Sequence, residues 1–154
     1  MRIDESLREA LLLEAAALGD ALGDARGDSP ARAEYDALSR AAAGGEVHDE
    51  LATPLERLLE LVLRTGRMRR LHGPEAEAAA VRLYHATPRG RALDAELAEV
   101  NAALAALAGQ VVARLAISAR GPGAYALTIE AASATLTLDI AADGVGVKDV
   151  SVGA

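Results

Sequence analysis

The spacing of apolar residues divides the chain into a helical part and a strand part at about residue 110. Before that point apolar residues such as Leu55 and Leu58 recur every three or four positions, which is the period of an amphipathic helix. From Val111 onward the period changes to two, which is the period of a half-buried strand. The pattern therefore predicts an α+β fold, with a helical body over residues 1–110 and an antiparallel β-meander over residues 111–154, both in one compact domain.

Glycine, proline and capping residues divide the helical body into about five helices. The clearest start is Thr53-Pro54, because Thr53 can cap a helix, Pro54 suits its first turn and Glu56 can close a capping box. Thr87-Pro88 gives a second start of the same kind, and Gly109 can take a left-handed position at the end of that last helix. The expected helices cover approximately residues 4–19, 30–43, 54–72, 74–85 and 88–108.

Three Gly-Asp pairs follow the first helix at a spacing of four residues: Gly19-Asp20, Gly23-Asp24 and Gly27-Asp28. With this spacing the three aspartates could share one helical face and hold a cation. However, each glycine in a helix interior costs roughly 1 kcal/mol relative to alanine. We therefore expect a fraying helix end that runs into a loop, and no cation site.

The fifth helix has the most regular apolar pattern of the chain. Its apolar positions are spaced by 4, 3, 4, 3 and 4 residues, as in a coiled-coil seam. They are Leu93, Leu97, Val100, Leu104, Leu107 and Val111. The seam either packs on other helices of the same chain or forms a contact between two copies. In the second case Leu97, Val100, Leu104 and Leu107 would carry the protein–protein interaction.

The last third of the chain predicts four strands joined by short turns. Gly121-Pro122-Gly123, Ser133-Ala134 and Asp143-Gly144 mark the turns, and the last of these is a strong two-residue hairpin signal. The alternation of the final strand shifts at Lys148-Asp149, which predicts a β-bulge. Strict alternation gives the meander one apolar and one polar face. We expect the fifth helix, which runs directly into the meander, to cover the apolar face.

Composition narrows the possible chemistry. The chain has no cysteine, so disulfides, thiolate metal sites and cysteine nucleophiles are excluded. It also has no Phe or Trp, so leucine, valine, isoleucine and alanine must fill its core in closely packed helices. The excess of arginine over lysine suggests a bacterial coding sequence. The absence of an export signal or a long apolar run leads us to expect a cytoplasmic protein without a membrane segment.

A basic block at residues 53–92 lies between two acidic parts of a chain whose net charge is −7. Its densest part is expected at the C-terminal end of the third helix. The residues are Arg64, Arg67, Arg69 and Arg70. They could bind the phosphates of a nucleic acid or another polyanion. Alternatively, the helix dipole favours cations at this position, and the basic and acidic blocks neutralise each other within or between chains.

Residues 82–93 (RLYHATPRGRAL) resemble the wing strand and the following helix start of winged-helix repressors, because they combine a tyrosine, a Thr-Pro pair and a glycine before a long helix. The resemblance implies a DNA-binding regulator. It covers about a dozen residues, and residues 74–80 are rich in Ala and Glu where a recognition helix should lie. No residue can therefore be assigned as a base reader.

We find no catalytic or metal-binding motif. His48 lies beside Asp49 and Glu50, but the histidine pair at positions i and i+4 that would complete a helical metal site is missing. No serine lies in a nucleophile elbow, and no glycine-rich loop suits a phosphate. We therefore predict a protein that is not an enzyme and needs no metal or cofactor. The leading hypothesis is an assembly or adaptor protein that binds another protein or forms a homodimer. The alternative is a nucleic-acid-associated regulator that binds phosphates through residues 64–91.

Overall fold

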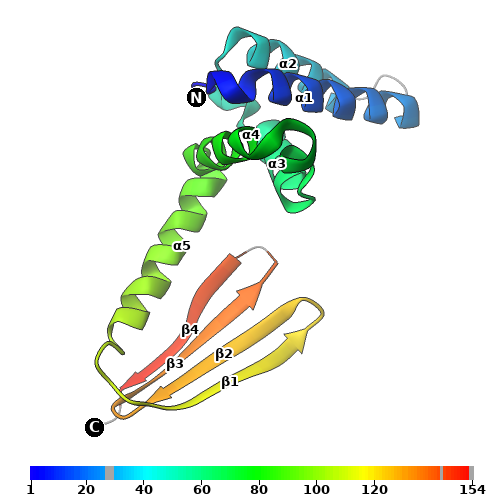
Figure 1. The fold of residues 1–154 in the computed structure, drawn as a ribbon. Coiled ribbons are helices and arrows are strands. Elements are labelled where there is room, and N and C mark those ends of the chain that lie inside the picture. The colour runs from blue at the N-terminus through cyan, green and yellow to red at the C-terminus, as the bar shows by residue number, and fades with distance from the viewer. Residues whose placement is uncertain (27–29, 143, 153–154) are drawn as a thin grey trace. The chain divides into compact units, whose positions relative to one another are not determined.

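The computed structural model describes residues 1–26, 30–142 and 144–152, and in this part of the chain five α-helices precede four strands (Figure 1). The helices are α1 (Glu5–Arg26), α2 (Pro30–Gly44), α3 (Ala52–Arg64), α4 (Arg67–Ala86) and α5 (Pro88–Ala105), with a 3-10 turn η1 at Asp49–Leu51. The strands are β1 (Val112–Gly121), β2 (Ala124–Ala131), β3 (Ala134–Ala141) and β4 (Gly144–Val152). The predicted α+β class, with helices followed by an antiparallel meander, is confirmed.

Contacts within the chain divide it into two compact units, Met1–Arg91 and Ala92–Ala154. The division falls inside α5, so most of this helix belongs with the sheet. Each unit has its own apolar core. The prediction that residues 1–110 and 111–154 behave as one domain stays a prediction.

The core of the first unit consists mainly of leucine and alanine side chains, as the absence of Phe and Trp requires. The helices α1, α3 and α4 contribute Leu7, Leu11, Leu55, Leu59 and Met68, which are all fully buried. The chain start is fixed to the segment after α2, because Ile3 N donates to Gly45 O at 2.9 Å and Val47 N donates to Met1 O at 2.8 Å. Small side chains allow these helices to approach closely.

Helix α1 is longer than the sequence predicts, and the expected fraying after Gly19 is wrong. The helix continues to Arg26 and passes through Gly19 and Gly23. A Cβ atom at Gly19 would lie 3.4 Å from Asp36 Oδ1 and 3.5 Å from Tyr35 Cβ, so the glycine lets α2 pack closely on α1. This packing offsets the low helix propensity of glycine. Gly27-Asp28, the last pair of the cation hypothesis, lies outside the described residues.

The predicted third helix is in fact two helices. Gly66 takes a left-handed conformation with φ 64°, so α3 ends at Arg64 and α4 begins at Arg67. A second break occurs inside α4 at Gly73, whose φ is 87°, and Pro74 restarts the helix there. The arginines of α4 therefore lie in its first turns, and the helix dipole does not favour them there.

The start of α3 also differs from the prediction. The helix begins at Ala52 directly after η1, and its N-cap residue Leu51 makes no side-chain hydrogen bond. Thr53 consequently lies inside the first turn and forms no capping box. Glu56 instead accepts a hydrogen bond from Arg89 N at 2.8 Å, so its carboxylate serves the first turn of α5.

The predicted start of α5 at Thr87-Pro88 is confirmed. Thr87 is fully buried, and its Oγ1 accepts a hydrogen bond from Gly90 N at 3.1 Å, which is the geometry of an N-cap. The same hydroxyl donates to Tyr84 O at 2.7 Å and so connects the end of α4 to the start of α5. Because residues 82–86 belong to α4, they form no wing strand, and the winged-helix resemblance fails at this point.

The sheet has the strand order β1-β2-β3-β4, and all neighbouring strands are antiparallel. The register places Leu115 opposite Ile129 and Ile129 opposite Leu136, so apolar side chains share one face. Thr137 pairs with Asp149 whereas Leu138 pairs with Val147. Lys148 is therefore an extra residue in β4, which confirms the predicted bulge. Asp143 of the predicted hairpin turn lies outside the described residues.

The connection between α4 and α5 requires glycine at position 90. A Cβ atom there would lie 2.7 Å from His85 Cα and even closer to Tyr84 O, which are both fixed backbone atoms. We expect Gly90→Ala to lower the free energy of unfolding by about 1–3 kcal/mol, which is typical of overpacking. Gly44→Ala is the control, because its Cβ would meet nothing within 4 Å, and it should leave stability unchanged or raise it by less than about 1 kcal/mol. Urea denaturation of both variants measures the difference, and equal stabilities would contradict the packing argument.

Candidate functional site

The apolar seam of α5 packs on the sheet of its own unit. Val100 is 5% exposed and lies in one cluster with Ile129, Leu136 and Leu138 of the sheet, and Leu104 and Leu107 pack against this cluster. Leu97 is half-buried. The expectation that an internal seam would pack on other helices is therefore wrong, because the seam packs on the sheet. Contact of the seam with a second protein stays a prediction.

The helix leaves part of the apolar face of the sheet uncovered. On β1 and the adjacent end of β2, Leu115 is 65% exposed, Ile117 is 68% exposed and Tyr125 is 44% exposed. The register places these side chains on the same face as the buried residues Ile129, Leu136 and Leu138. We call Leu115, Ile117 and Tyr125 the apolar strip. The other outer strand, β4, also exposes apolar side chains on this face, namely Val147, Val150 and Val152, but these side chains are smaller than those of the apolar strip.

The prediction that the last helix packs on the apolar face of the meander is confirmed, and the helix covers only part of that face. A helix is about 10 Å across, whereas the outer strands of a four-stranded sheet lie about 14 Å apart. One helix therefore covers two or three strands. This comparison of widths, made before the structure, would have identified an uncovered outer strand.

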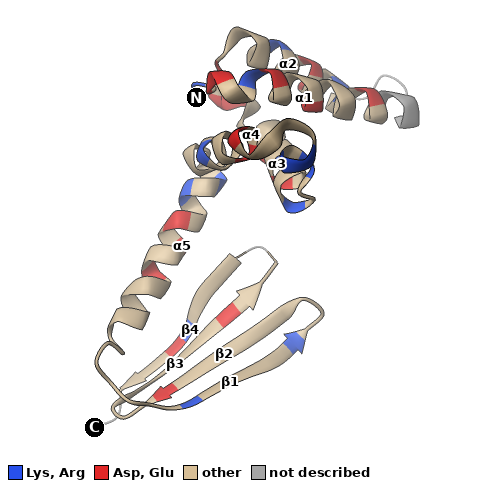
Figure 2. Cartoon of the chain, viewed as in Figure 1, with Lys and Arg blue, Asp and Glu red and all other residues tan. Residues whose placement is uncertain are grey.

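Charged residues are sparse on the described strands (Figure 2), and two ion pairs lie on the polar face of the sheet. Arg114 Nη1 lies 3.3 Å from Glu130 Oε1, and Arg120 Nη1 lies 3.8 Å from Asp139 Oδ1. Glu130 lies on the neighbouring strand β2, and Asp139 lies one strand further away on β3. The two arginines of β1 are thus directed to the polar face and do not shield the apolar strip.

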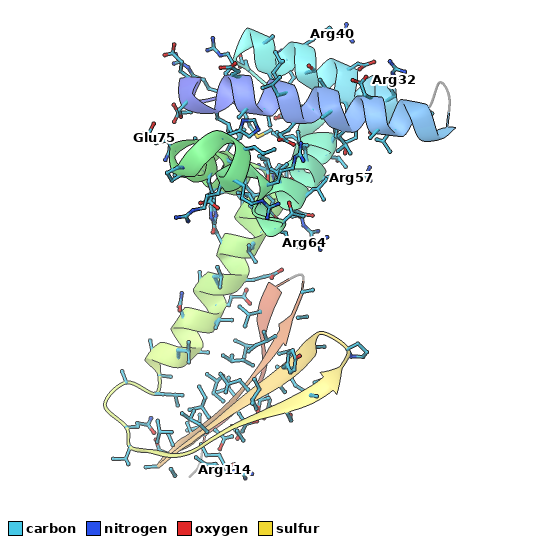
Figure 3. The ribbon with its side chains drawn as sticks, turned by 45° about the vertical axis from the view of Figure 1, so that its right-hand side comes forward. Arg32, Arg40, Arg57, Arg64, Glu75 and Arg114 are labelled. Carbon is cyan, nitrogen blue, oxygen red and sulfur yellow. The ribbon has the colours of Figure 1, made fainter. Side chains whose placement is uncertain are left out.

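The four arginines that could bind a polyanion do not form one group. Arg67 Nε lies 2.6 Å from Glu14 Oε2 of α1, and Arg69 Nη1 lies 3.3 Å from Glu77 Oε2. Arg64 and Arg70 are exposed, and Figure 3 shows Arg64 on the outside of the helical unit. Intramolecular ion pairs therefore account for two of the four residues. Binding of nucleic acid by Arg64, Arg67, Arg69 and Arg70 stays a prediction.

Glu14 is the most deeply buried acid among the described residues, with 5% of its surface exposed. It joins α1 to α4, because one carboxylate oxygen accepts from Arg67 and the other lies 2.9 Å from His72 Nε2. A second ion pair, Arg82 Nη2 to Asp4 Oδ2 at 2.7 Å, joins α4 to the residue that precedes α1 and lowers the pKa of Asp4. The basic block thus neutralises acids in and directly before the first helix.

A third network surrounds Tyr84 near the start of α5. Tyr84 Oη donates to Glu60 Oε1 at 3.0 Å, and Arg89 Nε pairs with the same oxygen. Burial, followed by the neighbouring Glu60 carboxylate, raises the pKa of Tyr84, and Glu60 also raises the pKa of Arg89. A phenol with a raised pKa stays protonated at neutral pH and cannot act as a general base. The network therefore fixes α3 to the first turn of α5.

Two surface hollows lie in the first unit. One of about 520 Å³ is lined mainly by charged residues, including Arg2, Asp4, Arg8 and Arg82. The other, of about 410 Å³, lies between α1, α3 and the start of α4 and includes Leu18, Leu61 and Arg70. Thr65 and Glu14 both line the second hollow, but Thr65 Oγ1 donates to Leu61 O at 2.7 Å and Glu14 contacts Arg67 and His72, so the carboxylate is not paired with the hydroxyl as a base would be.

Replacement of the buried carboxylate tests the ion pairs of Glu14. Glu14→Gln removes the charge that Arg67 and His72 face, while the shape is retained. We expect the free energy of unfolding to fall by about 1–2 kcal/mol. The loss is no larger because Arg67 is half-exposed and solvent weakens its ion pair with Glu14. Glu9→Gln on the exposed side of the same helix should change stability by less than about 0.5 kcal/mol. Urea denaturation compares the two, and an equal effect would show that the buried pair contributes nothing.

Metal-ligand groups and membrane-spanning helices were two further possibilities for the described residues. Within residues 1–26, 30–142 and 144–152, no group of three His, Asp or Glu side chains could hold a metal ion. The same part of the chain contains no helix with the length and apolar character needed to cross a membrane. The apolar strip is accordingly the feature on which a functional argument can rest. No protein-family model, no curated protein and no solved structure matches this chain.

Proposed function

We propose that this chain is a non-catalytic assembly or adaptor protein that binds another protein chain through the apolar strip of its sheet. The single observation that supports the proposal is the exposure of Leu115 and Ile117, each about two-thirds exposed, on the face of the sheet whose middle strands pack beneath α5. Contiguous exposed apolar side chains are typical of protein–protein interaction sites.

The energetics favour a covered state of this surface. Full burial of one leucine or isoleucine side chain contributes roughly 1.5–3 kcal/mol. Two such residues beside a tyrosine form a small apolar centre, and tyrosine is common at the energetic centre of interfaces. The paired charges on the opposite face would remain in water. The arrangement gives an apolar centre with a polar surrounding, as in known interfaces.

In this proposal the seam of α5 has a supporting role. Val100, Leu104 and Leu107 hold the helix on β2 and β3, so the helix determines which strand stays uncovered. Leu97 is half-buried at an earlier turn of the same helix. The four seam residues thus position the surface, and the partner contacts the apolar strip.

Photo-crosslinking in cells of the native host tests the proposal. A benzophenone amino acid replaces Ile117 on the apolar strip, and in a second variant it replaces Thr137 on the polar face of β3. We expect a protein adduct from position 117 and none from position 137, because only the first side chain would lie in the interface. Mass spectrometry identifies the adduct.

A second substitution shows whether the adduct depends on the surface. Leu115→Asp in the position-117 variant should reduce the yield of the adduct at least about tenfold. A tenfold loss of affinity corresponds to only about 1.4 kcal/mol of binding free energy, and burial of an unpaired charge costs more than that. Circular dichroism confirms that each variant is folded. An equal yield from positions 117 and 137, or no adduct from position 117, would contradict the proposed function.

A further inference from the structure

We propose that the partner is a second copy of this chain, and that the two copies join along β1 in an antiparallel pair centred on Ala116. This inference rests on the proposed function and identifies its partner. It follows from three properties of the second unit: the difference between the two edges of its sheet, the pairing of the charges on β1, and the symmetry of the β1 sequence.

The two edges of the sheet differ in how they are protected. An unpaired edge strand offers free backbone N–H and C=O groups, and proteins protect such edges with bulges and charges. The edge strand β4 has both, because Lys148 is the extra residue of a bulge and Asp149 follows it. The edge strand β1 has register shifts only at its two ends, between Val112 and Arg114 and between Ala119 and Gly121, and its middle pairs one-to-one with β2. The edge formed by β1 is therefore open to another strand.

The charges of β1 do not obstruct such pairing. Arg114 lies 3.3 Å from Glu130, and Arg120 forms a longer ion pair of 3.8 Å with Asp139, both on the polar face. The apolar face of the same strand carries Leu115 and Ile117, which are exposed. A second β1 strand would therefore meet apolar residues on one face and neutralised residues on the other.

Symmetry determines the register. In an antiparallel pair of identical strands, opposite residues lie on the same face of the sheet, and the pair is centred on one residue that faces its own copy. The longest overlaps of a strand that covers 112–121 are centred on Ala116 or on Ile117. Centring on Ile117 would place Arg114 opposite Arg120 of the second copy, and opposed like charges are destabilising.

Centring on Ala116 removes this conflict. Arg114 then lies opposite Ser118 of the second copy, and Leu115 lies opposite Ile117. Both leucine–isoleucine pairs fall on the apolar face, so the two apolar strips meet at the symmetry axis. Cross-strand apolar pairs of this kind stabilise antiparallel sheets. The chain thus supplies a self-complementary edge, which is the requirement for a symmetric dimer.

The absence of cysteine makes the register directly measurable. Ala116→Cys introduces a single thiol, and in the proposed dimer the two Cα atoms at this position lie about 4.5–5.5 Å apart, within the range of a disulfide. Ser118→Cys is the matched control, because its two copies would be four residues apart along the strands, or about 13 Å. Ser151→Cys reports on the opposite edge. We expect mild oxidation to crosslink Ala116→Cys at least about tenfold faster than either control.

Light scattering of the unmodified chain over a range of concentrations accompanies the crosslinking, so that a poorly folded variant does not decide the result. A dimer that crosslinks fastest at position 116 supports the inference. A dimer that crosslinks equally fast or faster at positions 118 or 151 overturns it and leaves the proposed function intact. A monomer whose position-117 photo-adduct is a different protein also overturns only the inference. A monomer without any adduct overturns both.

Discussion

The width of a helix relative to a sheet is the constraint on which the second unit depends. One α-helix covers the apolar side chains of about two strands, and α5 covers those of β2 and β3. The strand β1 is left with its leucine and isoleucine side chains in water. The other outer strand, β4, also exposes valine side chains on this face, but a bulge interrupts it. The interaction surface therefore results from the number of helices that the chain can place on its sheet.

The first unit is held together in a different way, by small residues and by ion pairs. Glycine at position 19 lets α2 approach α1, and glycine at position 90 lets α5 begin directly against the end of α4. Glu14 of α1 and Asp4, which precedes α1, form ion pairs with arginines of α4. Several arginines of the basic block are therefore already paired with acids of the same chain. They explain why a local excess of arginine need not indicate a nucleic-acid surface.

Periodicity predicted the elements well and their boundaries less well. The alternation after Val111 and the parity shift at Lys148 gave the meander and its bulge, because side-chain direction in a strand depends on the local sequence alone. Two boundaries at glycine were predicted incorrectly. Gly19 lies inside a helix that was expected to end there, and Gly66 separates two helices that were expected to be one. The difference lies in tertiary packing, since α2 packs against the first and not against the second. The uncovered strand could not be found from local patterns, because coverage depends on the relative sizes of elements that are distant in sequence.

The bulge at Lys148 has a consequence for how far such a protein can assemble. A sheet with two open edges can add copies at both sides without limit, which leads to filaments and precipitates. A sheet with one protected edge can add a single copy and is then closed. One additional residue in the last strand would thus make the difference between a particle of defined size and an open-ended polymer. Loss of that residue would turn an ordered assembly into an aggregation hazard.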